Sequence, residues 1–157
     1  MNFTLTSFST DKYYVGFKYP ALVTSMKQLD LPEFWEEFSK KFMKDEVSNL
    51  VEKKEAIGYM SFKNESSKSF EYYAACEVTE FGVTHDFHKI VIPKGDYLFF
   101  DIPFSNKDEE IEAVLNFIRK DSSIEYKINQ SFCFESYPET FDHEKEETSL
   151  YFVVPIF

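Results

Sequence analysis

The chain has 157 residues, a formal net charge of −11 and an aromatic content of 19%, nearly all of it Phe and Tyr. This length suits one domain with a single core over residues 1–157, and 43% apolar residues exclude a disordered chain. The acidic charge disfavours direct binding to nucleic acid or to an anionic membrane, because both are negatively charged. The same charge would attract a cationic ligand, and it also serves solubility.

The sequence also predicts where the protein resides. Residues 1–10 lack the pattern of a signal peptide, and no apolar stretch approaches the roughly 20 residues needed to span a bilayer. Cys76 and Cys133 lie in apolar, strand-like runs, so we expect small buried thiols in a reducing compartment. A cytoplasmic location follows.

The first half of the chain predicts a short polar leader, then a strand, a helix and two strands. The helix has Asp30 as its cap and an apolar stripe that continues to Val47 and Leu50. The last two strands are joined by a short polar connection and are expected to pair as an antiparallel hairpin. The predicted boundaries are 1–10 for the leader, Tyr13–Pro20 for the first strand, and Ala56–Lys63 and Phe70–Phe81 for the hairpin.

The second half repeats this order after a loose connection at residues 82–89 and a short strand-like run at Ile90–Ile92. The segment DYLFFDIP at residues 96–103 echoes YYVGFKYP at residues 13–20, and a capped helix with an apolar stripe from Ile111 to Ile118 follows. Ser131–Tyr137 and Ser149–Ile156 are the closing strands. We interpret the chain as two βαββ pseudo-repeats, about 12–81 and 90–157, within an α+β domain.

Four segments, taken in chain order, resemble the motifs of one known family. They are Tyr14-Val15-Gly16-Phe17, Tyr72-Tyr73-Ala74-Ala75-Cys76-Glu77-Val78, Ile92-Pro93-Lys94-Gly95-x-Tyr97, and the ending Phe134-Glu135-x-Tyr137 followed by an acidic loop and Leu150-Tyr151-Phe152-Val153-Val154-Pro155-Ile156. In this order and spacing, the set resembles the GyrI-like effector-binding domains. These occur attached to AraC-type and MerR-type transcription regulators and as standalone proteins.

The resemblance implies a fold and a function. It implies two βαββ units joined into a curved antiparallel sheet, with two helices on one face and a ligand cleft on the other. Members of the family bind hydrophobic, often cationic drugs between aromatic walls and a buried glutamate. Here Tyr151 stands where many members have a glutamate four residues before the closing proline, and Ala75 replaces a usual glycine. The acidic role would then pass to Glu77 or Glu135, or be absent.

The alternation of side chains along a strand sorts the candidate cleft residues from the core. Leu98, Phe100 and Ile102 are assigned to the core, which leaves Tyr97 and Phe99 for the cleft. The same rule and the resemblance predict one set of ligand-binding residues: Tyr14, Tyr73, Glu77, Tyr97, Phe99, Glu135 and Tyr151. The aromatic members would form a cage for a flat or cationic ligand. Alternatively, they form a second hydrophobic layer or a dimer surface.

No metal site or cofactor is expected. His85 and His88 lie three residues apart, but a metal would need further ligands at suitable spacing. We therefore expect a standalone sensor or sequestering module for a small hydrophobic molecule rather than an enzyme. Two alternatives stay open: a hydrolase of reactive electrophiles that uses Glu77 or Glu135 with Tyr97 or Tyr151, and an inhibitor of a basic protein partner such as DNA gyrase. The sequence leaves a homodimer open as well.

Overall fold

The structure is a computed structural model, and it describes residues 2–44, 56–63, 69–82, 87–120, 125–138, 145 and 148–157. The strands are β1 (Phe3–Phe8), β2 (Lys12–Lys18), β3 (Ala56–Phe62), β4 (Phe70–Val78), β5 (His88–Ile92), β6 (Gly95–Pro103), β7 (Phe132–Tyr137) and β8 (Ser149–Pro155). The helices are α1 (Leu31–Lys44) and α2 (Lys107–Lys120), each preceded by a short 3-10 turn, η1 (Met26–Gln28) or η2 (Phe104–Asn106).

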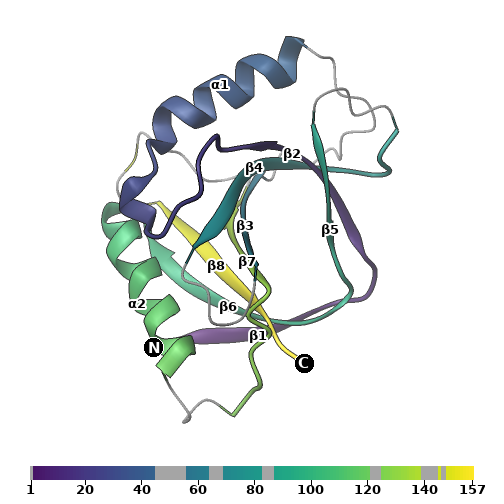
Figure 1. The fold of residues 1–157 in the computed structure, drawn as a ribbon. Helices are drawn as coiled ribbons and strands as arrows, with labels where there is room; N and C mark the ends of the chain where they lie inside the picture. The colour runs from purple at the N-terminus through teal and green to yellow at the C-terminus, as the bar shows by residue number, and fades with distance from the viewer. Residues whose placement is uncertain are drawn as a thin grey trace.

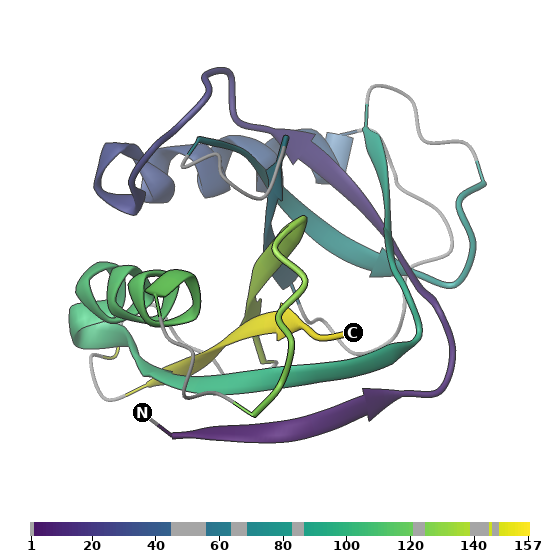
Figure 2. The same ribbon diagram turned by 60° about the horizontal axis from the view of Figure 1, so that its bottom comes forward.

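Within the described residues, the strands form one eight-stranded antiparallel sheet in the order β1-β6-β8-β7-β3-β4-β2-β5. The segment β2-α1-β3-β4 builds one half and β6-α2-β7-β8 the other, and the halves meet where β7 pairs with β3. The sheet is strongly curved, and both helices lie on its outer side (Figures 1 and 2). This arrangement confirms the predicted α+β fold.

The N-terminal segment differs from its prediction as a polar leader. Residues Phe3–Phe8 form β1, which pairs along its whole length with β6, from Phe3 opposite Phe100 to Phe8 opposite Gly95. Leu5 of this edge strand is 46% exposed, and the partly buried rings of Phe3 and Phe8 pack on opposite faces of the sheet. The alternation of Phe3-Thr4-Leu5-Thr6 is reversed at Ser7-Phe8, so the apolar residues do not share one face and the pattern that predicts a strand is short.

The helix-facing side of the sheet holds the larger core. Phe34 and Phe38 of α1 and Ile111 and Leu115 of α2 are buried against it, as their helical spacing predicted. Across from them lie the fully buried rings of the sheet: Tyr72, Phe100 and Phe152. The predicted stripe residues Val47 and Leu50 lie outside the described residues. Among the described residues, neither helix combines the length and apolarity that crossing a bilayer requires.

The concave side of the sheet holds a second cluster, made of Tyr14, Ile57, Ala75, Ile90, Ile92, Tyr97, Phe134 and Val153. Alternation along β6 therefore separates the two faces as predicted. Leu98, Phe100 and Ile102 belong to the helix-facing core, whereas Tyr97 and Phe99 belong to the concave side. Because every strand except β5 contributes to both clusters, the helix-facing core lies behind most of the concave aromatic surface.

A candidate ligand cleft on the concave face

Aromatic rings form a continuous row across the concave face. The successive contacts, given as distances between ring centroids, are His88–Tyr73 at 5.3 Å, Tyr73–Tyr59 at 6.0 Å, Tyr59–Phe132 at 5.6 Å, Phe132–Tyr97 at 6.4 Å, Tyr97–Phe8 at 4.9 Å, Phe8–Phe99 at 6.1 Å and Phe99–Tyr151 at 5.7 Å. These distances lie within the range of attractive ring pairs. The row runs from β5 at one edge of the sheet to β8 and β1, so both halves of the fold contribute to it.

A cavity of about 270 Å³ lies at the β5 end of this row. Its lining combines three polar or aromatic side chains of β3 and β4 with four residues of β5: Tyr59, Ser61, Tyr73, His88, Lys89, Ile90 and Val91. The curvature of the sheet makes this possible, because it lets the edge strand β5 approach β3 across the concave side (Figure 1). Aromatic walls with a few polar groups are typical of small-molecule sites.

The tyrosine hydroxyls of the cleft are neutral hydrogen-bonding groups at physiological pH. Burial raises the pKa of Tyr59 to about 12, with a smaller contribution from Cys133. Burial likewise raises the pKa of Tyr97 to about 12, and its hydroxyl donates to the Pro93 carbonyl at 2.6 Å. The Tyr73 hydroxyl donates to Glu71 Oε2 at 2.6 Å. The cleft therefore presents ring faces and fixed dipoles rather than phenolate charges.

The structure brings most of the predicted site residues together. Tyr14 and Tyr97 are buried in the concave cluster, Tyr73 and Phe99 pack against it, and Tyr151 is 39% exposed beside Phe99. Glu77 is half-buried on β4 opposite Tyr14 of β2, on the same side of the strand as Tyr73. Six of the seven predicted residues thus lie on one face.

Glu135 lies on the opposite face, away from the cleft. Along β7, Phe132 and Phe134 face the concave side, so alternation turns Glu135 toward the helices. There it is completely buried, accepts hydrogen bonds from the Tyr72 hydroxyl at 2.6 Å and the Tyr137 hydroxyl at 2.9 Å, and pairs with Lys107 Nζ at 2.9 Å. Its predicted place beside a ligand in the cleft is therefore wrong, because these three partners enclose its carboxylate.

The same network explains two further features. Burial lowers the pKa of Lys107, but the charges and hydrogen bonds of Glu135 and Asp108 outweigh it, so the pKa is raised overall. Gly58 lies opposite Glu135 in the β3–β7 register, and a Cβ atom there would collide with the Tyr72 hydroxyl and with Glu135 Oε1. Glycine at this position makes room for the buried hydrogen bond between Tyr72 and Glu135.

Several cleft residues escaped the sequence analysis: Phe8, Tyr59, His88, Phe132 and Phe134. The alternation rule identifies Phe132 and Phe134 once one residue of β7 is placed, and it was the placement of Glu135 that hid them. Phe8 lies in the segment interpreted as a leader. Tyr59 offered no signal beyond its place in a predicted strand, and His88 lies in a segment interpreted as a connection.

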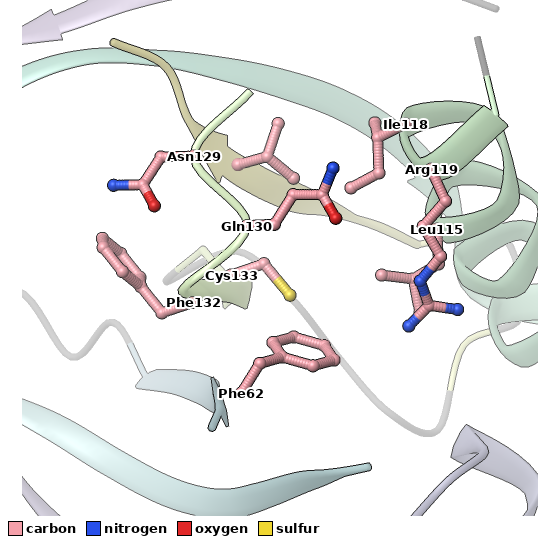
Figure 3. Close-up of a pocket in the computed structure, with 9 residues that line it drawn as sticks. Phe62, Leu115, Ile118, Arg119, Asn129, Gln130, Phe132 and Cys133 are labelled. Carbon is pink, nitrogen blue, oxygen red and sulfur yellow. The ribbon is translucent and has the colours of Figure 1, made fainter. Parts of the chain in front are cut away.

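A much smaller cavity of about 20 Å³ lies on the helix-facing side (Figure 3). The side chains of Arg119 from α2 and Gln130 from the segment before β7 reach it, together with Cys133 and Phe62. This volume is room for about one water molecule, so it does not compete with the cleft as a ligand site. Among the described residues, no group of three His, Cys, Asp or Glu side chains is placed to hold a metal ion. His85 lies outside the described residues.

A curved antiparallel sheet with helices on one face and an aromatic cleft on the other matches the GyrI-like fold that the sequence resemblance implied. Residues 11–155 match the sequence model of Cass2, described as the integron-associated effector binding protein. The protein belongs to this family. No sequence among the curated proteins matches the chain significantly.

Solved structures share the fold at low sequence identity. The protein SAV2435 bound to tetraphenylphosphonium has a TM-score of 0.74 and 14% identity, over 100% of this chain and 94% of that one. A candidate transcription regulation protein from Staphylococcus aureus MU50 has a TM-score of 0.68 and 15% identity, over 99% and 98% of the two chains. An integron cassette protein from Vibrio cholerae has a TM-score of 0.57 and 14% identity, over 99% and 95%.

Proposed function

We propose that this protein binds a small lipophilic molecule, planar or cationic, on the aromatic row of the concave face. The row and its 270 Å³ cavity carry this proposal, because they present a wide ring surface that the protein itself leaves partly uncovered. Membership of an effector-binding family supports it. So does the fold that the chain shares with a protein bound to tetraphenylphosphonium, a lipophilic cation.

The chemistry of the cleft favours flat and cationic ligands. A ring face attracts a cation through its quadrupole, and neighbouring rings can stack on a planar ligand. One ring already has such a partner, since Lys12 Nζ lies 4.7 Å above the ring of Phe8. The formal charge of −11 adds a general attraction for cations. We propose a role as a sensor or sequestering protein for such compounds, linked to transcription regulation or drug response.

Hydrolysis is less well supported. Of the two glutamates considered as a catalytic base, Glu135 is enclosed by Tyr72, Tyr137 and Lys107 on the helix-facing side. Glu77 is the remaining candidate. Among the contacts given for the described residues, none joins Glu77 to Tyr97 or Tyr151, the tyrosines proposed to assist it. Binding is therefore the function that the geometry supports best.

Thermal unfolding and calorimetry with tetraphenylphosphonium test the proposal. At 100 times Kd, a ligand that binds only the folded state adds about 2.7 kcal/mol, which for a chain of this size raises Tm by about 5–10 °C. We expect this rise for the wild type, and we expect Tyr59→Ala to reduce it by removing a ring that lines the cavity. Phe157→Ala, which removes a ring that is 71% exposed, is the control. If tetraphenylphosphonium and a panel of planar dyes all leave Tm unchanged, the proposal is wrong.

A further inference from the structure

We propose that Glu71 is the carboxylate through which the cleft selects a cation, and that the positive charge of the ligand takes the place of Lys18 beside it. This inference rests on the proposed function and adds a specificity-determining residue to it. The ligand class it names is a lipophilic monocation whose rings lie on Tyr73 and Tyr59.

The place of Glu71 in the sheet brings it to the cavity. Alternation along β4 puts it on the same face as Tyr73, and the β3–β4 register puts it directly opposite Ser61. Tyr73 and Ser61 both line the cavity, and side chains directly opposite in an antiparallel pair have Cβ atoms within about 5.5 Å. Glu71 therefore lies next to two of the residues that line the cavity.

The contacts of Glu71 hold it as a charged group. Tyr73 donates its hydroxyl hydrogen bond to Oε2, and this bond, followed by the charge of Lys18, keeps the pKa of Glu71 below its usual range. The carboxylate is thus ionised at neutral pH. Because Tyr73 is also a wall of the cavity, the hydrogen bond couples the position of the charge to the position of the ring.

Lys18 is a weak partner that a ligand can replace. Its Nζ lies 3.5 Å from Glu71 Oε2, and the two side chains are 42% and 30% exposed. Ion pairs this open contribute little net stability, because water and salt already screen both charges. Lys18 is opposite Tyr73 in the β2–β4 register, so its ammonium reaches Glu71 diagonally across the strand pair.

The other charges around the cleft favour Glu71 over the carboxylates first considered. Glu135 is enclosed on the far face by Lys107. Glu77 lies at the opposite end of β4, beside Tyr14 and away from Tyr59 and Ser61. Lys89 borders the cavity, but its ammonium lies 5.6 Å over the ring of Phe81, which packs with the helix-facing core. A cation on Tyr73 would therefore meet Glu71 first.

Calorimetric titration of the full chain at low salt tests this assignment with two probes, tetraphenylphosphonium and the neutral triphenylphosphine oxide. We expect Glu71→Gln to weaken binding of the cation by about 3- to 10-fold and to leave binding of the neutral probe within 2-fold. We expect Lys18→Gln to strengthen binding of the cation by about 2- to 5-fold, because the competing charge is gone. The exposed pair Lys27–Glu109 provides matched controls, Lys27→Gln and Glu109→Gln, which change the net charge equally.

The outcomes separate this inference from the proposed function. If the wild type binds the cation but Glu71→Gln and Lys18→Gln leave its affinity within 2-fold, the assignment of Glu71 is overturned and the binding function stands. If Glu77→Gln weakens binding of the cation and Glu71→Gln does not, the assignment of Glu71 is overturned as well, and Glu77 is the carboxylate that selects the cation. If the wild type binds neither probe, the function itself fails. Unchanged Tm values for the free variants show that folding is not the cause.

Discussion

The two faces of the sheet carry the same three types of side chain in two different environments. On the helix-facing side, Tyr72 and Lys107 hold Glu135; on the concave side, Tyr73 and Lys18 hold Glu71. The two tyrosines are neighbours in β4, and each donates its hydroxyl hydrogen bond at 2.6 Å. Alternation along a single strand therefore sends one copy of the motif into the core and the other to the cleft.

Burial decides what each copy can do. Lys107 and Glu135 are 10% and 0% exposed with 2.9 Å between their charged atoms, whereas Lys18 and Glu71 are 42% and 30% exposed at 3.5 Å. Removing one partner of a buried pair leaves an uncompensated charge, but an exposed pair is screened by water. The inner motif (Tyr72, Lys107 and Glu135) thus contributes to the stability of the fold. The outer motif (Tyr73, Lys18 and Glu71) can exchange its cation.

The largest expected effect on stability comes from removing Lys107, and removing Lys18 is the matched comparison. Lys107→Met should lower the free energy of unfolding by about 3–5 kcal/mol, because it leaves Glu135 buried without a counter-charge. Lys18→Met should change it by less than about 1 kcal/mol. Urea unfolding followed by circular dichroism measures both values.

A double variant sharpens this test. Lys107→Met combined with Glu135→Gln should recover part of the lost stability, because the uncompensated charge is gone. Equal losses for Lys107→Met and Lys18→Met would show that the two motifs are not in different environments, and the comparison between the faces would fail.

A smaller effect is expected at Gly58. Gly58→Ala should lower the free energy of unfolding by about 1–3 kcal/mol, because its Cβ atom would displace the Tyr72 hydroxyl and Glu135 Oε1 from their hydrogen bond. In a Tyr72→Phe background the same substitution should cost less, since the closest atom is absent. Urea unfolding of the four proteins of this cycle gives the coupling. Additive losses would mean that Gly58 is not required by the hydrogen bond.

Periodicity predicted much of the fold. The helical spacing of Phe34 and Phe38 located the buried side of α1, and the alternation of Leu98 and Phe99 separated the two faces of β6. In such segments only one side is buried, so apolar residues recur at the period of the helix or strand. Edge strand β1 carries a weaker period, because Phe3 and Phe8 pack on opposite faces and Leu5 is exposed.

The candidate site was predictable where the alternation rule could be applied without reference to other strands. Tyr97 and Phe99 were found in this way. Glu135 was placed from the resemblance to a family with an acidic anchor, and the face of β7 depends on its pairing with β3 and β8, which no local pattern shows. Glu71 follows a predicted loop, and its relation to Ser61 and Lys18 exists only once three strands are in register.

The smallest effect concerns Tyr59, the β3 tyrosine that lines the cavity. Burial raises the pKa of Tyr59 to about 12 from an unfolded value near 10. A folded pKa above the unfolded one means that this contribution to stability is fully present below pH 10 and is lost as the pH rises from 10 to 12. The contribution that Tyr59 loses by pH 10.5 is therefore less than about 1 kcal/mol.

A comparison of variants separates the contribution of Tyr59 from those of the buried Tyr72 and Tyr137, whose pKa values are also raised. Urea midpoints measured between pH 8 and pH 11 should fall less steeply above pH 10 for Tyr59→Phe than for the wild type. If Tyr59→Phe and the wild type fall in parallel, burial does not raise the pKa of Tyr59, and this prediction is wrong.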